Sequence, residues 1–388
     1  MAREIYLDYA ATTPVDPRVV EVMAECLGLD SDSANPSSTH APGRRAWARV
    51  QTARAQIAER IGASPDTVCF TSGATESDNM ALVGAMRANE HRGRHMITSA
   101  LEHKAILDTA RALEVQGVEV TYIDHDSDGV IDPDRLAEAL RDDTVLVSIM
   151  HVNNETGVLQ DIEALGQRCR ERGVLFHVDA AQSTGMVPLM LKQWPVDLLS
   201  LTAHKTYGPM GIGAIYIRKG VSLHPLIHGG EQERGVRPGT LATHQIAGFG
   251  KAFELADPER DGPAMAAMRD RLWAGLRAIE AVFLNGHPTQ RSPHLLNVTF
   301  PGVEGDSLQL ALAGVAISAG SACNSDVPEP SHVLRGMGLS DALAASTLRF
   351  SLGRFTTEAE IDYVVERIRE EVPRLRALAS GAPAWTVS

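Results

Sequence analysis

The sequence predicts an α/β protein built on a mostly parallel sheet with helices on both faces. With 388 residues, the chain is longer than one hydrophobic core usually serves, so a large and a smaller unit are expected. Through the first two thirds, strand-length apolar runs alternate with helical stretches, as in a parallel sheet. The last third has long helices and short strands, as in an α+β unit. We predict a large domain over 15–257, a small domain from 1–14 and 258–378, and a loose tail over 379–388.

The N-terminal elements precede the sheet. Residues 5–9 are expected to form a short edge strand or an extended arm, and a Pro-containing turn leads into a helix over about 18–26. Residues 30–43 are rich in Ser, Asn, Pro and Gly, which predicts a loop. Good helix formers with helical apolar spacing then predict a helix over 44–61, with Gly62 as its stop.

Seven strand-length apolar runs follow, and we predict that they form the sheet. The last two are joined by a short Gly-rich turn and allow an antiparallel hairpin as an alternative to parallel pairing. The runs are 67–71, 95–99, 119–123, 145–152, 175–178, 198–202 and 213–217. In the last third we predict a helix over 264–283, a helix over 358–378, and strands near 297–300, 315–318 and 347–351.

Composition excludes several classes of protein. A net charge of −13, from 36 basic and 49 acidic residues, argues against sequence-independent binding to nucleic acid. The four cysteines are far apart and show no zinc spacing, so neither a metal site nor a disulfide framework is expected. No apolar segment is long enough to cross a membrane, and the first residues lack a signal-peptide core, which predicts a cytoplasmic protein without membrane partners.

Polar residues at the ends of the predicted strands are the candidates for chemistry. Lys205 follows the strand 198–202, and in a parallel sheet the carboxyl ends of strands face the ligand cleft. Taken alone, a lysine there is more often a surface residue. The segment 71–77 joins a strand to a predicted helix over about 76–86, and its small and hydroxyl residues suit an anion cradle or, equally, a capped helix start.

Three further strand ends carry polar side chains. Asp179 ends an apolar run, and a buried carboxylate is costly unless paired, so it is expected to meet a cation or a protonated ring nitrogen, or else to cap the next helix. Gln182 follows it, Asn154 lies after another strand, and His103 after a third. A lone histidine such as His103 is more often a helix-start or packing residue than a catalytic one.

Together these residues supply a phosphate cradle, an acid, an amide, a flat ring and an amine. Pyridoxal 5'-phosphate needs that set, because it offers an aldehyde, a pyridine nitrogen, a ring face and a phosphate. Each signal is weak alone, and it is their succession at strand ends that indicates the cofactor.

From about residue 5 to 376, the chain resembles the NifS/IscS-like cysteine desulfurases of the class V aminotransferase family, which have pyridoxal-phosphate fold type I. The resemblance rests on the motifs YLDYAATT (6–13), TSGATES (71–77), NNETG (153–157), HVDAAQ (177–182), AHK (203–205), RPGT (237–240) and SAGSAC (318–323). It departs from the family at Pro238, where Ser is common, and at Glu231, where Gly is common.

The resemblance implies a role for each matching residue. Lys205 would bind the cofactor covalently, His103 would stack on its ring and move protons, and Asp179 would pair with the pyridine nitrogen. Gln182 would bond the phenolic oxygen. The implied cofactor contacts are Ala74, Thr75, His103, Asn154, Asp179, Gln182, Thr202, His204, Lys205 and, from the second subunit of a homodimer, Thr240. Arg349 would bind the substrate carboxylate, helped by Asn35 and Asn154.

Cys323 lies among small, polar and turn-forming residues, which predicts an exposed loop and a reactive thiol. The implied reaction converts L-cysteine to L-alanine and leaves the sulfur on Cys323 as a persulfide. An acceptor protein, an iron–sulfur scaffold or a thiolation factor, would then receive it. The alternatives are a selenocysteine lyase, a cysteine sulfinate desulfinase, an aminotransferase, or an accessory subunit without turnover. The sequence leaves the acceptor open.

Overall fold

The computed structural model describes residues 4–29, 31–319 and 330–379, and its largest element is a seven-stranded sheet. The strand order is β2-β8-β7-β6-β5-β3-β4. The strands are β2 (Val68–Thr71), β3 (His95–Ser99), β4 (Glu119–Ile123), β5 (Thr144–Met150), β6 (Leu175–Asp179), β7 (Leu198–Thr202) and β8 (Gly213–Ile217). Only β8 runs antiparallel to its neighbours, β2 and β7. The predicted fold class is confirmed, and of the two pairings considered for β7 and β8 the hairpin is correct.

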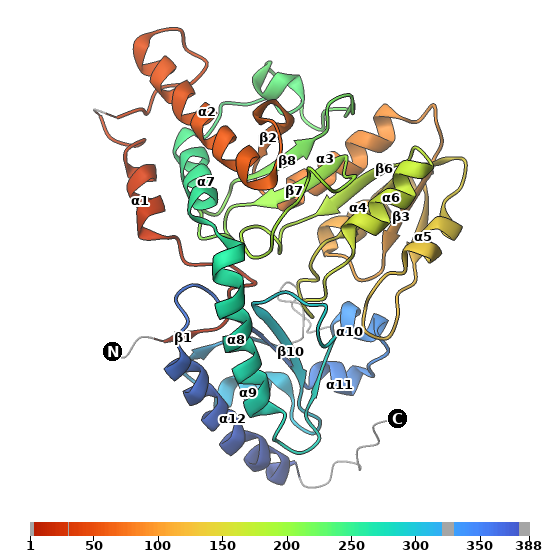
Figure 1. Ribbon diagram of the computed structural model, residues 1–388, viewed down its shortest axis with the longest axis vertical. Coiled ribbons are helices and arrows are strands. Elements are labelled where there is room, and N and C mark those ends of the chain that lie inside the picture. The colour runs from red at the N-terminus through yellow and green to blue at the C-terminus, as the bar shows by residue number, and fades with distance from the viewer. Residues whose placement is uncertain (1–3, 30, 320–329, 380–388) are drawn as a thin grey trace.

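Helices cover both faces of this sheet (Figure 1). One face packs against α2 (Ala41–Ile61), α5 (Pro133–Ala139), α6 (Ile162–Glu171) and α7 (Thr243–Leu255), and the other against α3 (Ala74–Ala88) and α4 (Lys104–Val115). Neighbouring residues of a strand serve opposite faces: Ile97 packs with the first group and Met96 with the second. Because helices cover both faces, most residues of the strands are buried, including polar ones such as Ser148 and His177.

Two helices begin earlier than the sequence pattern predicts. α2 begins at Ala41, inside the predicted loop, because the His40 Nδ1 accepts from the Gly43 amide at 3.2 Å and caps the helix. α8 (Pro258–Leu276) begins six residues early, because Asp257 caps it by accepting from the Arg260 amide at 3.2 Å. Both starts contain proline, which the first helical turn tolerates. Likewise α1 (Pro17–Ala24) begins at a proline.

The expected extension of β5 to Val152 is wrong. The chain leaves the sheet after Met150, and Val152 instead forms an antiparallel bridge with Leu159. The turn over 152–159 places Asn154 and Glu155 near the carboxyl ends of β5, β6 and β7.

A second, antiparallel sheet lies beyond α8 (Figure 1). Its order is β12-β13-β10-β9, with β9 (Phe283–Leu284), β10 (Leu295–Thr299), β12 (Ser318–Ala319) and β13 (Thr347–Ser351). β1 (Ile5–Tyr6) pairs in parallel with β11 (Val315–Ala316) beside it. The remaining elements are α9 (Gly305–Ala311), α10 (His332–Gly336), α11 (Asp341–Ala345), α12 (Glu358–Leu378) and the short helices η1 (Pro65–Thr67) and η2 (Gln232–Gly235).

The second sheet has its own apolar core, which includes Leu272 of α8, Phe350 of β13 and Ile361 of α12. The N-terminal arm joins it, since Leu7 is fully buried there. We retain the division at residue 257 as a proposal. No helix in the described ranges is long and apolar enough to span a bilayer.

Candidate functional site

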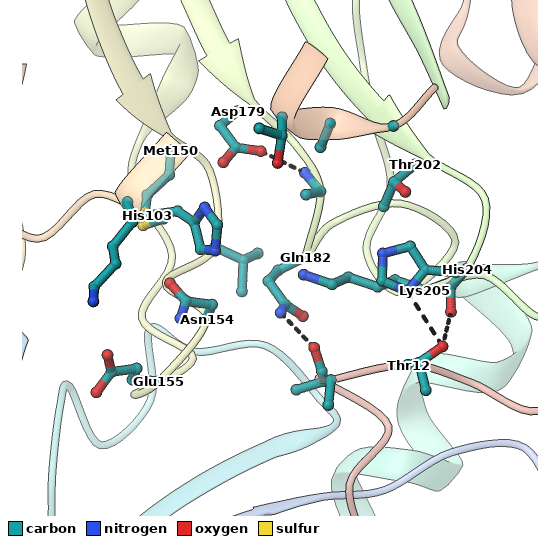
Figure 2. Close-up of a pocket in the computed structure, with 18 of the residues that line it drawn as sticks. Thr12, His103, Met150, Asn154, Glu155, Asp179, Gln182, Thr202, His204 and Lys205 are labelled. Carbon is teal, nitrogen blue, oxygen red and sulfur yellow. Dashed lines mark hydrogen bonds between the residues drawn. The ribbon is translucent and has the colours of Figure 1, made fainter. Parts of the chain in front are cut away.

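A cavity of about 640 Å³ lies at the carboxyl ends of β5, β6 and β7. Its walls also include the N-terminal arm at Ala10 and, from the second sheet, Asn297 and Arg349. Figure 2 shows Lys205, Asp179, His103 and Gln182 around it. The structure thus brings together residues that follow three separate strands in the sequence.

Lys205 follows β7 and lines the cavity. Burial disfavours the ammonium form and lowers the pKa of Lys205 to about 8, with Arg349 acting in the same direction and Asp179 opposing it. None of the carboxylates in the described ranges forms an ion pair with Lys205. A substantial fraction of its amine is therefore neutral, and nucleophilic, near neutral pH.

Asp179 ends β6 and is 5% exposed. Its Oδ1 accepts from the Ala181 amide at 2.8 Å, so the carboxylate is fixed in orientation at the cavity (Figure 2). The buried Gln182 donates from Nε2 to the Ala10 carbonyl at 2.9 Å. The amide is thereby anchored to the N-terminal arm.

His103 caps a helix, as one reading of its sequence position predicts, and it also lines the cavity. Its Nδ1 accepts from the Ala105 amide at 3.1 Å and caps α4, while its ring faces the cavity (Figure 2). Desolvation lowers the pKa of His103, and Lys205 and His332 add to this against the opposing Asp179. With Nδ1 as the acceptor, the neutral ring carries its proton on Nε2.

The anion cradle is the N-terminus of α3. The helix begins at Ala74, so the first backbone N–H groups, including those of Ala74 and Thr75, have no partner within the helix. Thr202 adds a buried hydroxyl with no hydrogen-bond partner. His204, whose Nδ1 lies 3.2 Å from the Thr12 hydroxyl, closes the same wall, and burial lowers its pKa to about 4.

Arg349 on β13 points into the cavity from the second sheet. Its Nη1 donates to the Asn154 carbonyl at 2.9 Å and its Nη2 to the Asp8 Oδ1 at 2.9 Å. Its Nε and the Asn154 Oδ1 are buried without partners. A guanidinium and an amide are thus available to an α-carboxylate that enters the cavity.

Two of the predicted residues in the described ranges are not at this cavity. Thr240 and Asn35 are exposed and do not contribute to its lining. The Asn35 Oδ1 instead accepts from the Ser37 amide at 2.9 Å. Cys323 lies outside the described residues.

Sequence reasoning missed Asp8, which contacts a lining residue from behind, and two residues that line the cavity themselves. Asp8, which holds Arg349, lies within the motif 6–13, and a carboxylate next to the buried Leu7 was the signal that could have found it. Glu155 and His332 also line the cavity. Burial raises the pKa of Glu155, which accepts from the Ser331 hydroxyl. His332 lies in a helix of only five residues, which no periodicity marks.

The donor set fits pyridoxal 5'-phosphate. The α3 N-terminus and the unpartnered Thr202 hydroxyl suit its phosphate, Asp179 its pyridine nitrogen, and the Lys205 amine its aldehyde. A buried hydroxyl without a partner, as at Thr202, is the mark of a site completed by a ligand. Within the described part of the chain, no cluster of His, Cys, Asp and Glu is arranged to hold a metal ion.

Comparison with known proteins places this site in a family. Residues 5–364 match the family model described as "Aminotransferase class-V". The chain therefore belongs to the class V aminotransferase family.

Individual relatives are more specific. The chain is 54% identical over 390 residues to "Cysteine desulfurase IscS" of Proteus mirabilis, an alignment that covers 99% of this chain and 96% of the relative. Among solved structures, a "NIFS-LIKE PROTEIN" superposes with a TM-score of 0.89 at 37% identity, covering 96% of this chain and 100% of that one. "SspA in complex with cysteine" gives a TM-score of 0.81 at 39% identity, covering 91% and 100%.

Proposed function

We propose that this protein is a pyridoxal-phosphate-dependent cysteine desulfurase that converts L-cysteine to L-alanine and passes the sulfur to Cys323 as a persulfide. The observation that carries the proposal is the Lys205 amine of lowered pKa, which shares one cavity with an anion cradle and the fixed carboxylate of Asp179. The 54% identity to the Proteus mirabilis desulfurase supports the substrate and the reaction.

The cavity residues named by the resemblance each have a place in this proposal. The N-terminal amides of α3 at Ala74 and Thr75, with Thr202 and His204, would hold the phosphate. Asp179 would pair with the ring nitrogen, Gln182 would bond the phenolic oxygen, His103 would cover the ring, and Asn154 would also contact the cofactor. When bound, pyridoxal phosphate supplies a conjugated ring that withdraws electrons from the α-carbon of an amino acid.

The substrate is held and deprotonated by side chains on opposite walls. Arg349 and Asn154 bind the α-carboxylate of cysteine by donating from the guanidinium and from the side-chain NH₂ of Asn154. The neutral Lys205 amine takes the α-proton, since a pKa of about 8 leaves it a base near neutral pH. His103 Nε2 carries a proton at the cavity surface, where it can be given to the departing product.

Sulfur transfer is assigned to Cys323. Its thiolate attacks the substrate sulfur, a sulfur–sulfur bond forms, the carbon–sulfur bond breaks, and the electron pair stays with the substrate carbon. That carbon takes a proton and leaves as the methyl group of alanine, while Cys323 keeps a persulfide. No external oxidant or reductant is required.

We propose a homodimer in which the second copy completes the site. The chain exposes several large apolar side chains, among them Leu29, Trp47 and Met210. Trp47 lines an open cavity of about 1070 Å³ between α2 and residues 231–241, the segment that leads to the exposed Thr240. A partner covering this face would bring its Thr240 to the phosphate and its Asn35 to the substrate.

Subunit complementation tests the dimer. In the proposed dimer, each site takes Lys205 from one subunit and Thr240 from the other. Lys205→Ala and Thr240→Ala are therefore each expected to lower activity when both subunits carry the same change. A mixed dimer contains one site with an intact Lys205 and the partner's intact Thr240, so co-expression is expected to restore activity. Two inactive variants that fail to complement, or a monomer in sedimentation, would contradict the shared site.

The sulfur acceptor is proposed only by class: a cytoplasmic protein, an iron–sulfur scaffold or a thiolation factor, with no membrane or direct nucleic-acid partner. A selenocysteine lyase, a cysteine sulfinate desulfinase or an aminotransferase would use the same cavity.

Product analysis decides between these activities. With a thiol reductant present, purified holoenzyme is expected to yield alanine and sulfide in equal amounts from L-cysteine, and to prefer cysteine over selenocysteine and cysteine sulfinate. Turnover of the other two with none of cysteine would contradict the proposal. No turnover of any of them would favour an accessory subunit.

A further inference from the structure

Asp78 is a buried acid that the proposed reaction does not use. It lies on α3, one helical turn after Thr75 of the anion cradle, and borders the cavity. The residue is 1% exposed, and its Oδ1 has no hydrogen-bond partner. A buried oxygen left unpaired in this way costs free energy, and the cost is far larger for an ionised carboxylate than for a carboxylic acid.

The nearest ring does not neutralise Asp78. The His177 Nε2 lies 3.7 Å from the Asp78 Oδ1, which would be an ion pair only if the imidazole were protonated. Burial lowers the pKa of His177 to about 3, so the ring is neutral. Its two nitrogens bond hydroxyls, Nδ1 to Ser148 at 2.8 Å and Nε2 to Ser200 at 3.0 Å. Asp78 therefore borders an uncharged chain of hydrogen bonds.

The charged groups that face Asp78 come from three other elements. Asp179 lies on β6 two residues after His177, and so on the same face of the sheet. Glu102, between β3 and α4, is also buried. Lys205 is the cation among these residues, and burial lowers its pKa. Burial first, then the charge of Asp179, raise the pKa of Asp78 well above its usual range.

Two carboxylates in one buried site do not both ionise at low cost. Asp179 accepts the Ala181 amide at 2.8 Å, whereas Asp78 has only the hydrogen bond with the Ser200 hydroxyl to lower its pKa against burial, and its Oδ1 has no partner. Of the two carboxyl groups, Asp78 is therefore the one that keeps its proton, and Asp179 is the one that ionises.

We propose that Asp78 is a positioning residue that stays a neutral carboxylic acid beneath the cavity, so that Asp179 is the only anion at the ring-nitrogen end of the site. The neutral acid donates its proton to the hydrogen-bonded chain of Ser200, His177 and Ser148. This orders the face of the sheet from which Asp179 projects. The inference rests on the proposed function for the role of Asp179, but not for the protonation of Asp78.

Infrared spectroscopy of the holoenzyme tests the protonation directly. A protonated carboxylic acid has a C=O stretch that is separate from the amide and carboxylate bands. At neutral pH the wild type is expected to show this band, and biosynthetic labelling with ¹³C-aspartate is expected to shift it. The label separates Asp78 from the buried Glu102. Absence of any aspartate-sensitive carboxylic-acid band would overturn the proposal without requiring a variant that folds.

Substitution then assigns the band and its consequence. Asp78→Asn, an uncharged residue of the same shape, is expected to remove the band and to keep the affinity for pyridoxal phosphate within about threefold, since it retains a donor for the chain. Asp78→Ala is expected to weaken that affinity about tenfold or more, the usual size of an effect on a supporting hydrogen bond. An Asp78→Asn protein that retains the band, or loses affinity as Asp78→Ala does, would contradict the proposal.

The experiments distinguish a failure of the proposed function from a failure of the proposal for Asp78. If the wild type shows the aspartate band but makes no alanine from cysteine, the proposed function is wrong and the neutral Asp78 stands. If the wild type makes alanine but lacks the aspartate band, the proposal for Asp78 is wrong and the proposed function stands.

Discussion

The guanidinium of Arg349 donates to the carboxylate of Asp8 at 2.9 Å, although 341 positions separate the two residues. The Ser318 hydroxyl donates to the same Asp8 oxygen at 2.9 Å and lies 3.2 Å from Arg349 Nη2. The N-terminal arm therefore fixes the side chain proposed to bind the substrate carboxylate. Because the pair is largely shielded from solvent, with side chains 13% and 20% exposed, the contact constrains the geometry of Arg349.

Removing the acid should loosen that guanidinium. Asp8→Ala is expected to raise the KM for cysteine about tenfold with a smaller effect on kcat, because Arg349 loses its orientation. Steady-state alanine production measures both constants. Asp134→Ala, which removes an exposed partner of Arg168, is the matched control and should leave them unchanged. An unchanged KM in Asp8→Ala would show that Arg349 is positioned by other contacts.

The lowered pKa of Lys205 predicts a pH dependence. The folded-state pKa of about 8 lies below the ordinary lysine value, so the neutral amine is the minor form below about pH 8 and predominates above it. Competitive acetylation of the cofactor-free protein should show Lys205 reactivity rising about tenfold per pH unit up to about pH 8 and then levelling. Reactivity that keeps rising above pH 8 in parallel with exposed lysines such as Lys219 would contradict the burial argument.

Gly213 should be essential to the anion cradle. It pairs with Thr202 of β7 and Thr71 of β2, and a Cβ there would lie 2.5 Å from the Leu201 carbonyl oxygen and 2.7 Å from the Gly73 Cα. These are backbone atoms, so the cradle must shift. Gly213→Ala is expected to weaken pyridoxal phosphate binding about tenfold or more in titrations of the cofactor-free protein. Gly28→Ala, which meets only the Ser31 Cβ at 3.9 Å, should bind normally.

The sequence predicted the sheet well because its strands are buried on both faces. Apolar runs such as 198–202 are short and bounded by turn residues, which is the pattern of a parallel strand covered by helices on both sides. Helix starts at Ala41 and Pro258 were missed because proline and glycine were taken as loop formers where they belong to the first turn.

The site was predictable wherever function lies at the end of a strand. Lys205, Asp179 and Asn154 share that position, and topology alone brings them together. Asp8 and Asp78 were not singled out, because their importance lies in partners from distant elements, Arg349 and the His177 chain. The carboxylate beside the buried Leu7 is a local signal for Asp8, but no local pattern identifies the distant partner of either residue.

The buried ion pair of Arg54 and Glu233 should dominate the stability of residues 231–241. Glu233 accepts from the two Arg54 Nη atoms at 2.6 and 2.8 Å and from the Phe70 amide at 2.8 Å, and both side chains are almost fully buried. Its backbone φ of +46° is a strained conformation that these bonds maintain.

Glu233→Ala leaves the Arg54 charge buried without a counter-ion, although its bond to the Val68 carbonyl remains. We expect a loss of about 3–5 kcal/mol in the free energy of unfolding, measured by urea denaturation followed by circular dichroism. Asp362→Ala removes an exposed partner of Arg271 and serves as the control, with little measurable change expected. Equal stability of the two variants would show that the segment is held by other contacts.

The central claim is that Cys323 receives the sulfur of cysteine, and a single-turnover reaction with radiolabelled cysteine tests it most directly. Without reductant, each active site is expected to release one alanine and to retain one labelled sulfur, removable by thiols and located by peptide mapping on Cys323. Cys323→Ala should bind the cofactor normally and retain no label, whereas Cys26→Ala, at a buried thiol, should behave as the wild type. Wild-type rates of alanine formation in Cys323→Ala, or label on another residue, would contradict the account.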